Sequence, residues 1–278
     1  MSILKIEDLS YKYEFSKINA IDNINFKVDK TEIIGLIGHT GSGKSTFVQL
    51  LNGILKPTSG EIFLNDVNIK NIENLYSKIG IVFQNPENQL FSDTVYNDIS
   101  FGLEKLNLNK QEVKNRVCDS LKFVNLSKEI LEKNPFELSG GQKRKVALAG
   151  VFCMEPEILV LDEPTSSLDP ISKKLLIKNI INYKETKKNI VIFITHNMEE
   201  VAKISDRILV MSKGKFVSID TPEKIFSEPE KLKNLNLEIP QITQIMINLN
   251  NQNYKIKNNI INVENAVNIL LDLYRKNY

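Results

Sequence analysis

Near its N-terminus the chain has two stretches in which apolar and polar residues alternate. Ile3 to Leu9 and Ile24 to Val28 follow the two-residue period of a strand, which predicts two half-buried strands. Later runs are short and almost wholly apolar, which predicts strands in the core of a sheet. These runs are Ile33 to Ile37, Ile79 to Phe83, Ile158 to Leu161 and Ile190 to Ile194. Shorter strands are predicted at Glu61 to Leu64 and, as a closing hairpin, at Arg207 to Met211 and Lys215 to Ile219.

Between about residues 94 and 153 the apolar period lengthens to that of a helix, which predicts an all-helical insert between strands. Its segments are Val95 to Leu106, Lys110 to Val124, a short piece at Leu126 to Leu131, and Gly140 to Cys153. A further helix is predicted at Ile171 to Tyr183, after the turn Ser166-Ser167-Leu168-Asp169-Pro170. Strands and helices in this arrangement predict an α/β fold.

Thr221-Pro222-Glu223 is a helix cap, and beyond about Glu228 asparagine and lysine dominate. An apolar stripe nevertheless persists at Leu232, Leu235, Leu237, Ile239, Ile242, Ile245, Met246 and Leu249. Disorder is the alternative for so Asn-rich a segment, and the stripe argues against it. We therefore expect a small appendage of short helices, with Ala266 to Tyr274 as the last.

The composition is that of an ordinary soluble globular protein, with 278 residues, 42% hydrophobic and 25% charged. The net charge of +2 gives no reason to expect a nucleic-acid partner or an anionic membrane surface. There is no signal-peptide core and no run of 18 apolar residues, so at a membrane another chain would have to supply the spanning helices. Cys118 and Cys153 lack metal spacing and are expected to be reduced cytosolic thiols.

The run Ile33 to Ile37 leads into GHTGSGKST, a glycine-rich turn followed by a helix-compatible segment, which is the context that a phosphate loop requires. We expect Gly38, Gly41 and Gly43 to take positive φ, so that successive N–H groups point at a phosphate. Lys44 reaches the β- and γ-phosphates, and the Ser45 hydroxyl binds the bridging Mg²⁺. The predicted nucleotide-binding residues are Gly38, His39, Thr40, Gly41, Ser42, Gly43, Lys44, Ser45 and Thr46. A fortuitous glycine turn is the alternative, and the flanking strand argues against it.

Two adjacent carboxylates, Asp162 and Glu163, follow the apolar run Ile158 to Leu161, at the strand end where open α/β sheets hold ligands. Successive residues of an extended segment point opposite ways, so the two acids can divide the work. Asp162 would hold Mg²⁺, and Glu163 would orient and deprotonate the attacking water. A solvated acidic turn is the alternative, and it fits poorly after so apolar a strand.

Three more residues are candidates by their position. Gln84 follows a strand that Pro86 ends, and its amide either faces bound nucleotide or caps a loop. His196 lies at the tip of the strand Ile190 to Ile194, where a hydrogen bond to a γ-phosphate competes with a structural role. Tyr13 provides a flat ring on which an adenine could stack, although tyrosines are more often structural.

The segment Leu138 to Gln142 reads LSGGQ. Ser139 is a good N-cap, and Gly140 and Gly141 expose backbone N–H groups at the first positions of a helix. This is a second anion-binding helix start in the same chain, but it has no lysine to complete a site. Plain capping is the alternative when the segment is considered alone.

Together, GHTGSGKST, Gln84, LSGGQ, ILVLDE, the Ser-Leu-Asp turn and His196 have the order and spacing found in ATP-binding cassette (ABC) ATPases, which the chain resembles over residues 1 to about 222. FQNPENQLF, NPFELSGGQ and the appended C-terminal segment are most similar to the ATPase subunits of energy-coupling factor (ECF) transporters, which import vitamins and nickel or cobalt. The resemblance implies an α/β fold with a phosphate-loop (RecA-like) core sheet, an antiparallel β subdomain, a helical subdomain at about 94–153 and a small C-terminal helical appendage. It also implies two parts, an ABC ATPase domain at 1–222 and an ECF-type dimerisation segment at 223–278.

The resemblance further implies ATP hydrolysis in a head-to-tail dimer with an identical or homologous second ATPase subunit. In such a dimer the LSGGQ segment of one subunit covers the ATP held by the phosphate loop of the other. The helical insert would grip a transmembrane coupling subunit, and through it a substrate-binding membrane component, at the cytoplasmic face of the membrane. The implied roles are catalysis by Glu163, His196 and Gln84, Mg²⁺ binding by Ser45, Gln84 and Asp162, adenine stacking by Tyr13, ATP contact by Ser139, Gly140, Gly141 and Gln142, and a dimer-spanning turn at Asp169.

Two other functions remain open, a soluble cassette ATPase acting on ribosomes or DNA and an ATP-gated clamp. The presence of Glu163 argues against a clamp, and the chain has neither the second cassette nor the long coiled coil of the soluble classes. PTSSLDP departs from the Ala-Gly that many relatives have before Leu-Asp, and the C-terminal segment matches by register and apolar stripe only. No residue identifies the transported cargo or decides between a homodimer and a pair with a paralogue.

Overall fold

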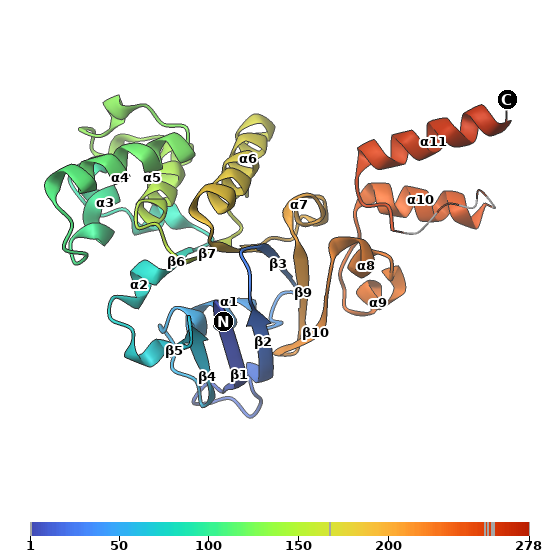
Figure 1. The fold of residues 1–278 in the computed structure, drawn as a ribbon, viewed down its shortest axis with the longest axis horizontal. Coiled ribbons are helices and arrows are strands. Elements are labelled where there is room, and N and C mark those ends of the chain that lie inside the picture. The colour runs from blue at the N-terminus through green and yellow to red at the C-terminus, as the bar shows by residue number, and fades with distance from the viewer. Residues whose placement is uncertain (1, 167, 253, 255, 257–258, 278) are drawn as a thin grey trace.

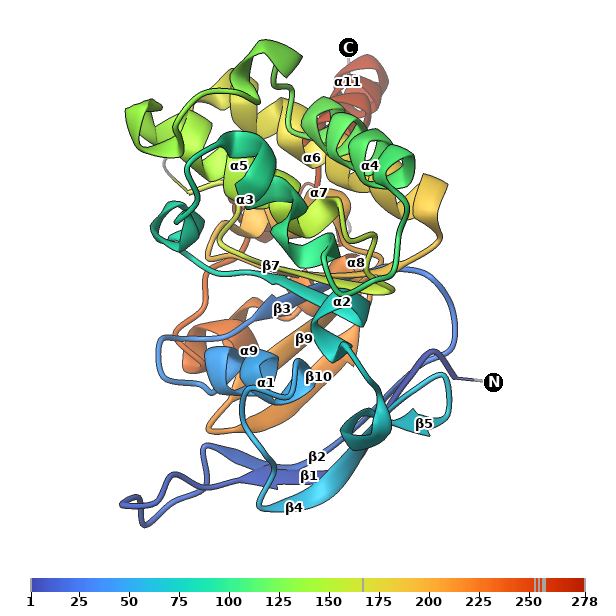
Figure 2. The same cartoon turned by 90° about the vertical axis from the view of Figure 1, so that its left-hand side faces the viewer.

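The computed structural model describes residues 2–166, 168–252, 254, 256 and 259–277, so Ser167 of the predicted turn lies outside the described residues. A six-stranded sheet in the order β10-β9-β3-β8-β7-β6 runs through the middle of the molecule (Figures 1 and 2). Its strands are β3 (Ile33–Ile37), β6 (Ile79–Val82), β7 (Ile158–Asp162), β8 (Ile190–Ile194), β9 (Arg207–Ser212) and β10 (Lys215–Asp220). All neighbours pair in parallel except β10, which pairs antiparallel with β9 in the predicted hairpin.

Both faces of this core sheet are buried, which explains why its strands are apolar at nearly every position. Val160 and Ile192 belong to the core on one face, whereas their neighbours Leu161 and Phe193 belong to the core on the other. The first face packs against helix α1 (Lys44–Leu51) and the antiparallel sheet, and the second packs against the helical subdomain.

The antiparallel sheet lies below the core sheet in Figure 2, with strand order β2-β1-β4-β5. Its strands are β1 (Leu4–Tyr11), β2 (Ile21–Val28), β4 (Ser59–Leu64) and β5 (Val67–Asn68). Both alternating stretches of the sequence are therefore strands, as predicted. Side chains from three of these strands, including Leu4, Phe26 and Ile62, complete the core around α1.

The helical subdomain lies above the core sheet in Figure 2. Its elements are α3 (Val95–Ser100), η3 (Phe101–Leu103), α4 (Lys110–Phe123), η4 (Lys128–Ile130), η5 (Pro135–Glu137) and α5 (Gly140–Phe152), and α6 (Pro170–Lys187) packs beside them. The predicted helix from Val95 to Leu106 is wrong in its second half, because the α-helix ends at Ser100 and tightens into the 3₁₀ turn η3. Gly102 lies in that turn, where a Cβ would be 2.6 Å from the Met154 sulfur.

Several short elements went unpredicted because each spans about two helical turns or fewer, too little for a periodic signal. They are η1 (Ile69–Asn71), α2 (Leu75–Lys78), η2 (Pro86–Gln89) and α7 (Met198–Ile204).

The C-terminal helices are α8 (Pro222–Phe226), α9 (Pro229–Asn234), α10 (Gln241–Asn251) and α11 (Val263–Asn277). Phe226 and Leu232 share a core with Val210 of β9, so α8 and α9 pack onto the core sheet. In contrast, α10 and α11 stand apart on one side of the molecule (Figure 1), around a separate core that contains Met246 and Ala266. None of the helices in the described part of the chain has the length and apolar character needed to span a membrane.

Candidate functional site

The residues predicted to contact the phosphates and the attacking water lie at one edge of the core sheet. The phosphate loop follows β3, Gln84 comes shortly after β6, Glu163 follows β7 and His196 comes shortly after β8. Because these strands are parallel, their carboxyl ends share one edge of the sheet. A cavity of about 430 Å³ lies there, lined by Tyr13, Ala20, Thr40, Gly41, Gly43, Lys44, Ser45, Thr46, Gln84, Asp162, Glu163 and His196.

The phosphate loop turns sharply before α1. Gly41 has φ +80° and Gly43 has φ +112°, the left-handed region that glycine adopts without steric cost, as predicted. Gly43 is the N-cap of α1, and its carbonyl accepts a hydrogen bond from the Phe47 N–H at 2.9 Å. The positive end of the α1 dipole and its first N–H groups therefore lie at the cavity wall, where they favour an anion.

The prediction of positive φ at Gly38 is wrong. Gly38 does not have a positive φ, but a Cβ there would lie 2.4 Å from the Met211 carbonyl oxygen and 2.6 Å from Ser42 Oγ. The glycine is thus required by close packing and not by backbone conformation. Gly38, His39 and Ser42 are absent from the described cavity lining. Within the loop, the Ser42 N–H donates to the His39 carbonyl at 3.1 Å.

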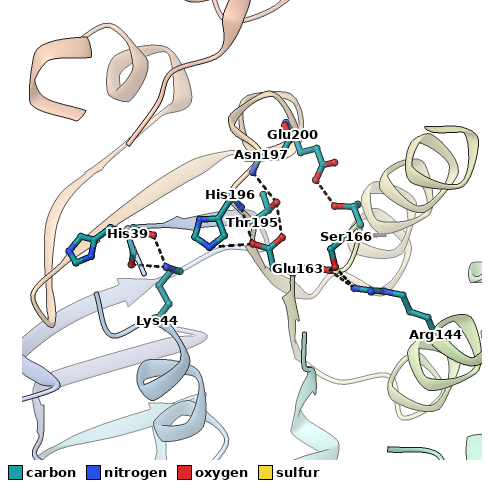
Figure 3. Close-up of polar contacts among 11 residues, drawn as sticks. His39, Lys44, Arg144, Glu163, Ser166, Thr195, His196, Asn197 and Glu200 are labelled. Atoms are coloured by element: carbon teal, nitrogen blue, oxygen red, sulfur yellow. Dashed lines mark hydrogen bonds and ion pairs between the residues drawn. The ribbon is translucent and has the colours of Figure 1, made fainter. Parts of the chain in front are cut away.

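Lys44 curls back over the loop that precedes it. Its Nζ donates to the carbonyl of Gly38 at 2.6 Å and to that of His39 at 3.1 Å (Figure 3). Burial lowers the pKa of Lys44, and the charges of Asp162 and Glu163 act in the opposite direction. The cavity therefore holds one partly buried cation facing two acids.

Tyr13 lies at the rim of the same cavity. Its hydroxyl is 3.0 Å from Thr46 Oγ1, and its ring packs edge-on against Tyr11 with 4.9 Å between ring centroids. The side chain remains 45% exposed, so ring surface is available to a flat ligand at the cavity mouth.

Asp162 and Glu163 both line the cavity, so the prediction that they point opposite ways is wrong. Strand β7 ends at Asp162, and Glu163 has φ +52°, which breaks the alternation of an extended chain. The two carboxylates therefore share one space. Burial raises the pKa of Asp162, the Glu163 charge raises it further, and Lys44 and His196 oppose the change.

Glu163 is held by the end of β8 (Figure 3). Its carboxylate accepts a hydrogen bond from the His196 backbone N–H at 3.0 Å and one from Thr195 Oγ1 at 3.4 Å, and its N–H donates to the Ile194 carbonyl at 2.9 Å. The His196 ring is next to it, with Nε2 3.6 Å from Glu163 Oε1. This network fixes a carboxylate beside an imidazole at the open edge of the sheet.

The LSGGQ segment is absent from the described lining of this cavity. Ser139 is the N-cap of α5 in a capping box, because the Gln142 N–H donates to Ser139 Oγ at 3.3 Å and the Ser139 N–H donates to Gln142 Oε1 at 3.1 Å. Gly140 and Gly141 are exposed, and a Cβ on either would meet nothing within 4 Å. The backbone of this turn is therefore exposed, and it lies outside the described lining of the cavity.

Sequence reasoning missed three contributors to the site. Ala20 lines the cavity from the segment before β2, and no sequence signal marks it. The Thr195 hydroxyl reaches Glu163, as described above. Arg144 is a buried cation of α5, and its signal is visible in the sequence, since it occupies the apolar stripe position four residues before Leu148 and eight before Phe152.

The family model described as "ABC transporter" matches residues 21–166, which is more than half of the chain. The chain belongs to the ABC transporter family. The predicted resemblance and the predicted fold class are thereby confirmed, and this ABC ATPase binds ATP, as the phosphate loop indicates.

Curated relatives align with this ABC ATPase along nearly its whole length. It is 43% identical to the "Energy-coupling factor transporter ATP-binding protein EcfA2" of Caldanaerobacter subterraneus subsp. tengcongensis, over 98% of each chain. It is also 40% identical to the protein EcfA1 of Clostridium perfringens, over 98% of this chain and 99% of the relative. The resemblance to ECF ATP-binding subunits is therefore confirmed at the level of the full chain.

Solved structures give the same assignment of fold. Cbio1 of Clostridium perfringens, described as part of the ABC transporter complex cbiONQ, has a TM-score of 0.74 and 38% identity, over 88% of this chain and 99% of that one. The ATP-binding cassette MJ0796, solved as a dimer with ADP and Pi, has a TM-score of 0.70 and 25% identity, over 79% of this chain and 98% of that one.

Proposed function

We propose that this chain is the ATP-binding and ATP-hydrolysing subunit of an ECF-type importer and works in a head-to-tail dimer. The observation that carries the proposal is the division of the site. The cavity gathers Lys44, Gln84, Glu163 and His196, whereas the exposed helix start at Ser139 lies elsewhere. Inverting a second ATPase over the first brings its LSGGQ segment to this cavity, and each ATP then lies between two helix N-termini.

Closure of such a dimer follows from electrostatics. The phosphates of ATP are attracted by the α1 N-terminus and Lys44 on one subunit and by the α5 N-terminus of the partner. Hydrolysis and loss of phosphate remove the charge that joins the two, so the dimer opens. The dimer therefore closes when ATP binds and opens after ATP is hydrolysed.

The cavity also fits Mg²⁺. Ser45, Gln84 and Asp162 offer a hydroxyl, an amide and a carboxylate oxygen in one space, which are the ligand types that Mg²⁺ prefers. The described residues contain no cluster of three His, Cys, Asp or Glu that could hold a metal, in keeping with an ion that usually relies on substrate phosphates. When bound, Mg²⁺ would neutralise phosphate charge. Its positive charge would also oppose the effects of burial and of the Glu163 charge, which raise the pKa of Asp162.

Within this cavity the residues have distinct roles. Glu163, fixed by the Thr195 hydroxyl and the His196 N–H, orients the attacking water and accepts its proton. The His196 side chain donates to the γ-phosphate, and Gln84 contacts the water and the metal. The Tyr13 ring stacks on adenine at the cavity mouth.

A second cavity, of about 420 Å³, suits the membrane partner. It lies between α2, α3 and α5, and its lining includes Tyr76, Phe91, Phe101 and Met154. Phe91 and Phe101 are 59% and 53% exposed and pack edge to face, which is unusual for a surface with no partner. We assign this groove to a helix of the transmembrane coupling subunit, with the chain held peripherally at the cytoplasmic face. Because Gln89 of this groove lies five residues after Gln84, the nucleotide and the membrane subunit would contact the same segment of the chain.

The C-terminal helices complete the proposed assembly. Residues 1–222 form the ATPase domain, and within the appended segment 223–278 it is α11 that carries an outward apolar face. That face consists of Val263, Val267, Leu270, Leu271 and Tyr274, which are 37–65% exposed. We assign it to contacts between the two ATPases.

Mixing two inactive variants tests the shared site. Lys44→Ala removes one half of each site and Ser139→Ala removes the other half, so each variant alone has little ATPase activity. In a mixed dimer one site has both defects and the other has neither. Activity should therefore recover on mixing to roughly a quarter of the wild-type value, since about half of the dimers are mixed and half of their sites are intact.

The wild-type chain assayed alone is the reference for this experiment. Failure of the mixture to recover activity, with dimers demonstrably exchanging subunits, would show that each chain builds its site alone and would overturn the head-to-tail proposal. Full activity of the Ser139→Ala variant by itself would do the same.

A further inference from the structure

Arg144 is buried in the wall between α5 and the catalytic edge of the sheet. Its side chain is 4% exposed. One guanidinium nitrogen, Nη2, donates to the Glu163 carbonyl and to Ser166 Oγ, the latter at 2.9 Å (Figure 3). The same nitrogen also reaches the Gln84 carbonyl at 3.5 Å. A single side chain of the helical subdomain thus contacts the backbone of both Glu163 and Gln84, the two residues proposed to contact the attacking water.

A buried guanidinium normally pairs with a carboxylate, because an uncompensated charge in the interior is costly. In the described part of the chain no carboxylate forms an ion pair with Arg144 within 4 Å, and its Nε has no hydrogen-bond partner. Burial lowers the pKa of Arg144, and the more distant charges of Glu87 and Glu163 oppose the change. Burying this guanidinium therefore costs free energy, which a role in packing alone would not explain.

The carbonyl that Arg144 holds belongs to a peptide in an unusual conformation. Glu163 has φ +52°, a region that costs a residue with a side chain about 1 kcal/mol or more. Its carbonyl also accepts hydrogen bonds from the Ser166 N–H at 3.2 Å and from Ser166 Oγ at 3.0 Å. Fixing this carbonyl fixes the direction in which the Glu163 side chain leaves the strand.

We propose that Arg144 is a positioning residue for ATP hydrolysis, which holds the backbone of Glu163 and Gln84 so that both side chains face the attacking water. The proposal rests on the catalytic roles proposed above for these two residues. Arg144 lies five residues after Ser139 on α5, so one helix both begins with the LSGGQ turn and sets the position of Glu163. A shift of α5 when it meets the partner's ATP is thereby transmitted to the catalytic carboxylate.

Steady-state kinetics of the full-length ATPase in its native complex tests this role. Arg144→Met keeps the long aliphatic stem and removes every donor, and Arg144→Lys returns one donor. Arg116→Met is the matched control, since Arg116 on α4 is half-buried, donates to the Met154 carbonyl at 3.3 Å and lies outside the site. For each variant kcat, KM for ATP and the thermal unfolding midpoint are measured, with Glu163→Gln in parallel.

Arg144→Met should lower kcat on the order of 10²-fold, the effect of misplacing a reacting group by about 1 Å. KM for ATP should stay within about threefold, because Arg144 does not line the nucleotide cavity. Arg144→Lys should recover part of the lost kcat, and Arg116→Met should lower the unfolding midpoint with wild-type kcat.

A rise in KM at unchanged kcat would assign Arg144 to substrate binding and overturn the proposal. So would equal kcat losses in Arg144→Met and Arg116→Met, which would indicate a general structural role. Wild-type kcat in Glu163→Gln would instead refute the catalytic assignment of Glu163 and the positioning role with it. A large loss in Glu163→Gln together with wild-type kcat in Arg144→Met would refute only the positioning role.

Discussion

Asp162 is the residue at which stability and function are in clearest conflict. Its pKa is raised by burial first and by the Glu163 charge second. An acid with a higher pKa in the folded than in the unfolded chain binds more protons when folded, so its ionised form destabilises the fold. In the proposed function the acid is needed because its charge helps to hold Mg²⁺ bound with the nucleotide.

Asp162→Asn should therefore be more stable than the wild type and inactive. Near neutral pH we expect the free energy of unfolding to rise by on the order of 1 kcal/mol, a usual gain when a functional-site charge is removed. As the pH falls from the raised pKa of Asp162 toward the ordinary value of 3.8, the wild type becomes protonated at this residue and the difference shrinks. Urea denaturation at a series of pH values measures both effects.

The exposed residue Asp93 provides the control for this prediction. Asp93→Asn should change the free energy of unfolding by less than about 0.5 kcal/mol at any pH. A gain in Asp162→Asn that is the same at every pH would contradict the electrostatic explanation.

Among the helices, α1 and α5 both begin beside glycines, but these glycines differ in backbone conformation and surroundings. Gly43 before α1 needs the left-handed region, with φ +112°. Gly141 in the first turn of α5 has no positive φ and open space around its missing Cβ. In the proposed dimer, the missing Cβ at this position would leave room for the partner's ATP.

Gly141→Ala should consequently raise the stability of the fold and lower the ATPase activity. Alanine is the better helix former, so the free energy of unfolding should rise by about 0.5–1 kcal/mol. In the closed dimer the added methyl group would stand between the α5 N–H groups and the γ-phosphate, and kcat should fall on the order of 10²-fold, as when one such donor is lost. Thermal unfolding and ATPase assays of the same preparation test both the expected rise in stability and the expected fall in kcat.

Gly150→Ala, in the same helix, is the matched control, because its Cβ would make only ordinary contacts, at 3.7 Å and beyond. It should change kcat little. If Gly141→Ala had wild-type ATPase activity, the LSGGQ turn would not contact ATP.

At the same scale, the sequence predicted the long or strongly patterned elements and failed where tertiary contacts decide. The apolar runs identified β3, β7 and β8 because both faces of the sheet are buried. In contrast, the 3₁₀ turn that follows α3 contains Gly102, whose missing Cβ leaves room for Met154 from a distant segment, a contact that no local pattern predicts. The shared direction of Asp162 and Glu163 depends on one left-handed residue that no local pattern requires. The sequence does not predict the role of Arg144, because a helix period is read from apolar residues and Arg144 is a charged residue at a core position.

In the molecule as a whole, α11 has apolar surface that its contacts within one chain do not cover. One side of it, with Ala266, Ile269 and Leu273, belongs to the small core shared with α10. Beside this side lies a second apolar face, which is exposed and consists of Val263, Val267, Leu270, Leu271 and Tyr274. An exposed apolar face next to a buried one is expected to be covered by a partner, and a second ATPase is the partner that the proposed divided site requires.

Leu271→Glu should therefore weaken the dimer without unfolding the subunit. A charge buried at the centre of an apolar contact raises the dissociation constant by on the order of tenfold or more. Because each site needs two subunits, the protein concentration that gives half-maximal ATPase activity should rise by the same factor, while kcat at saturating protein is unchanged. Val217→Glu on β10, at a residue 41% exposed and far from α11 in sequence, is the control and should leave this concentration unchanged. If both variants dimerise as the wild type does, by sedimentation and by activity, the outer face of α11 serves another partner and the ATPase domains alone hold the dimer together.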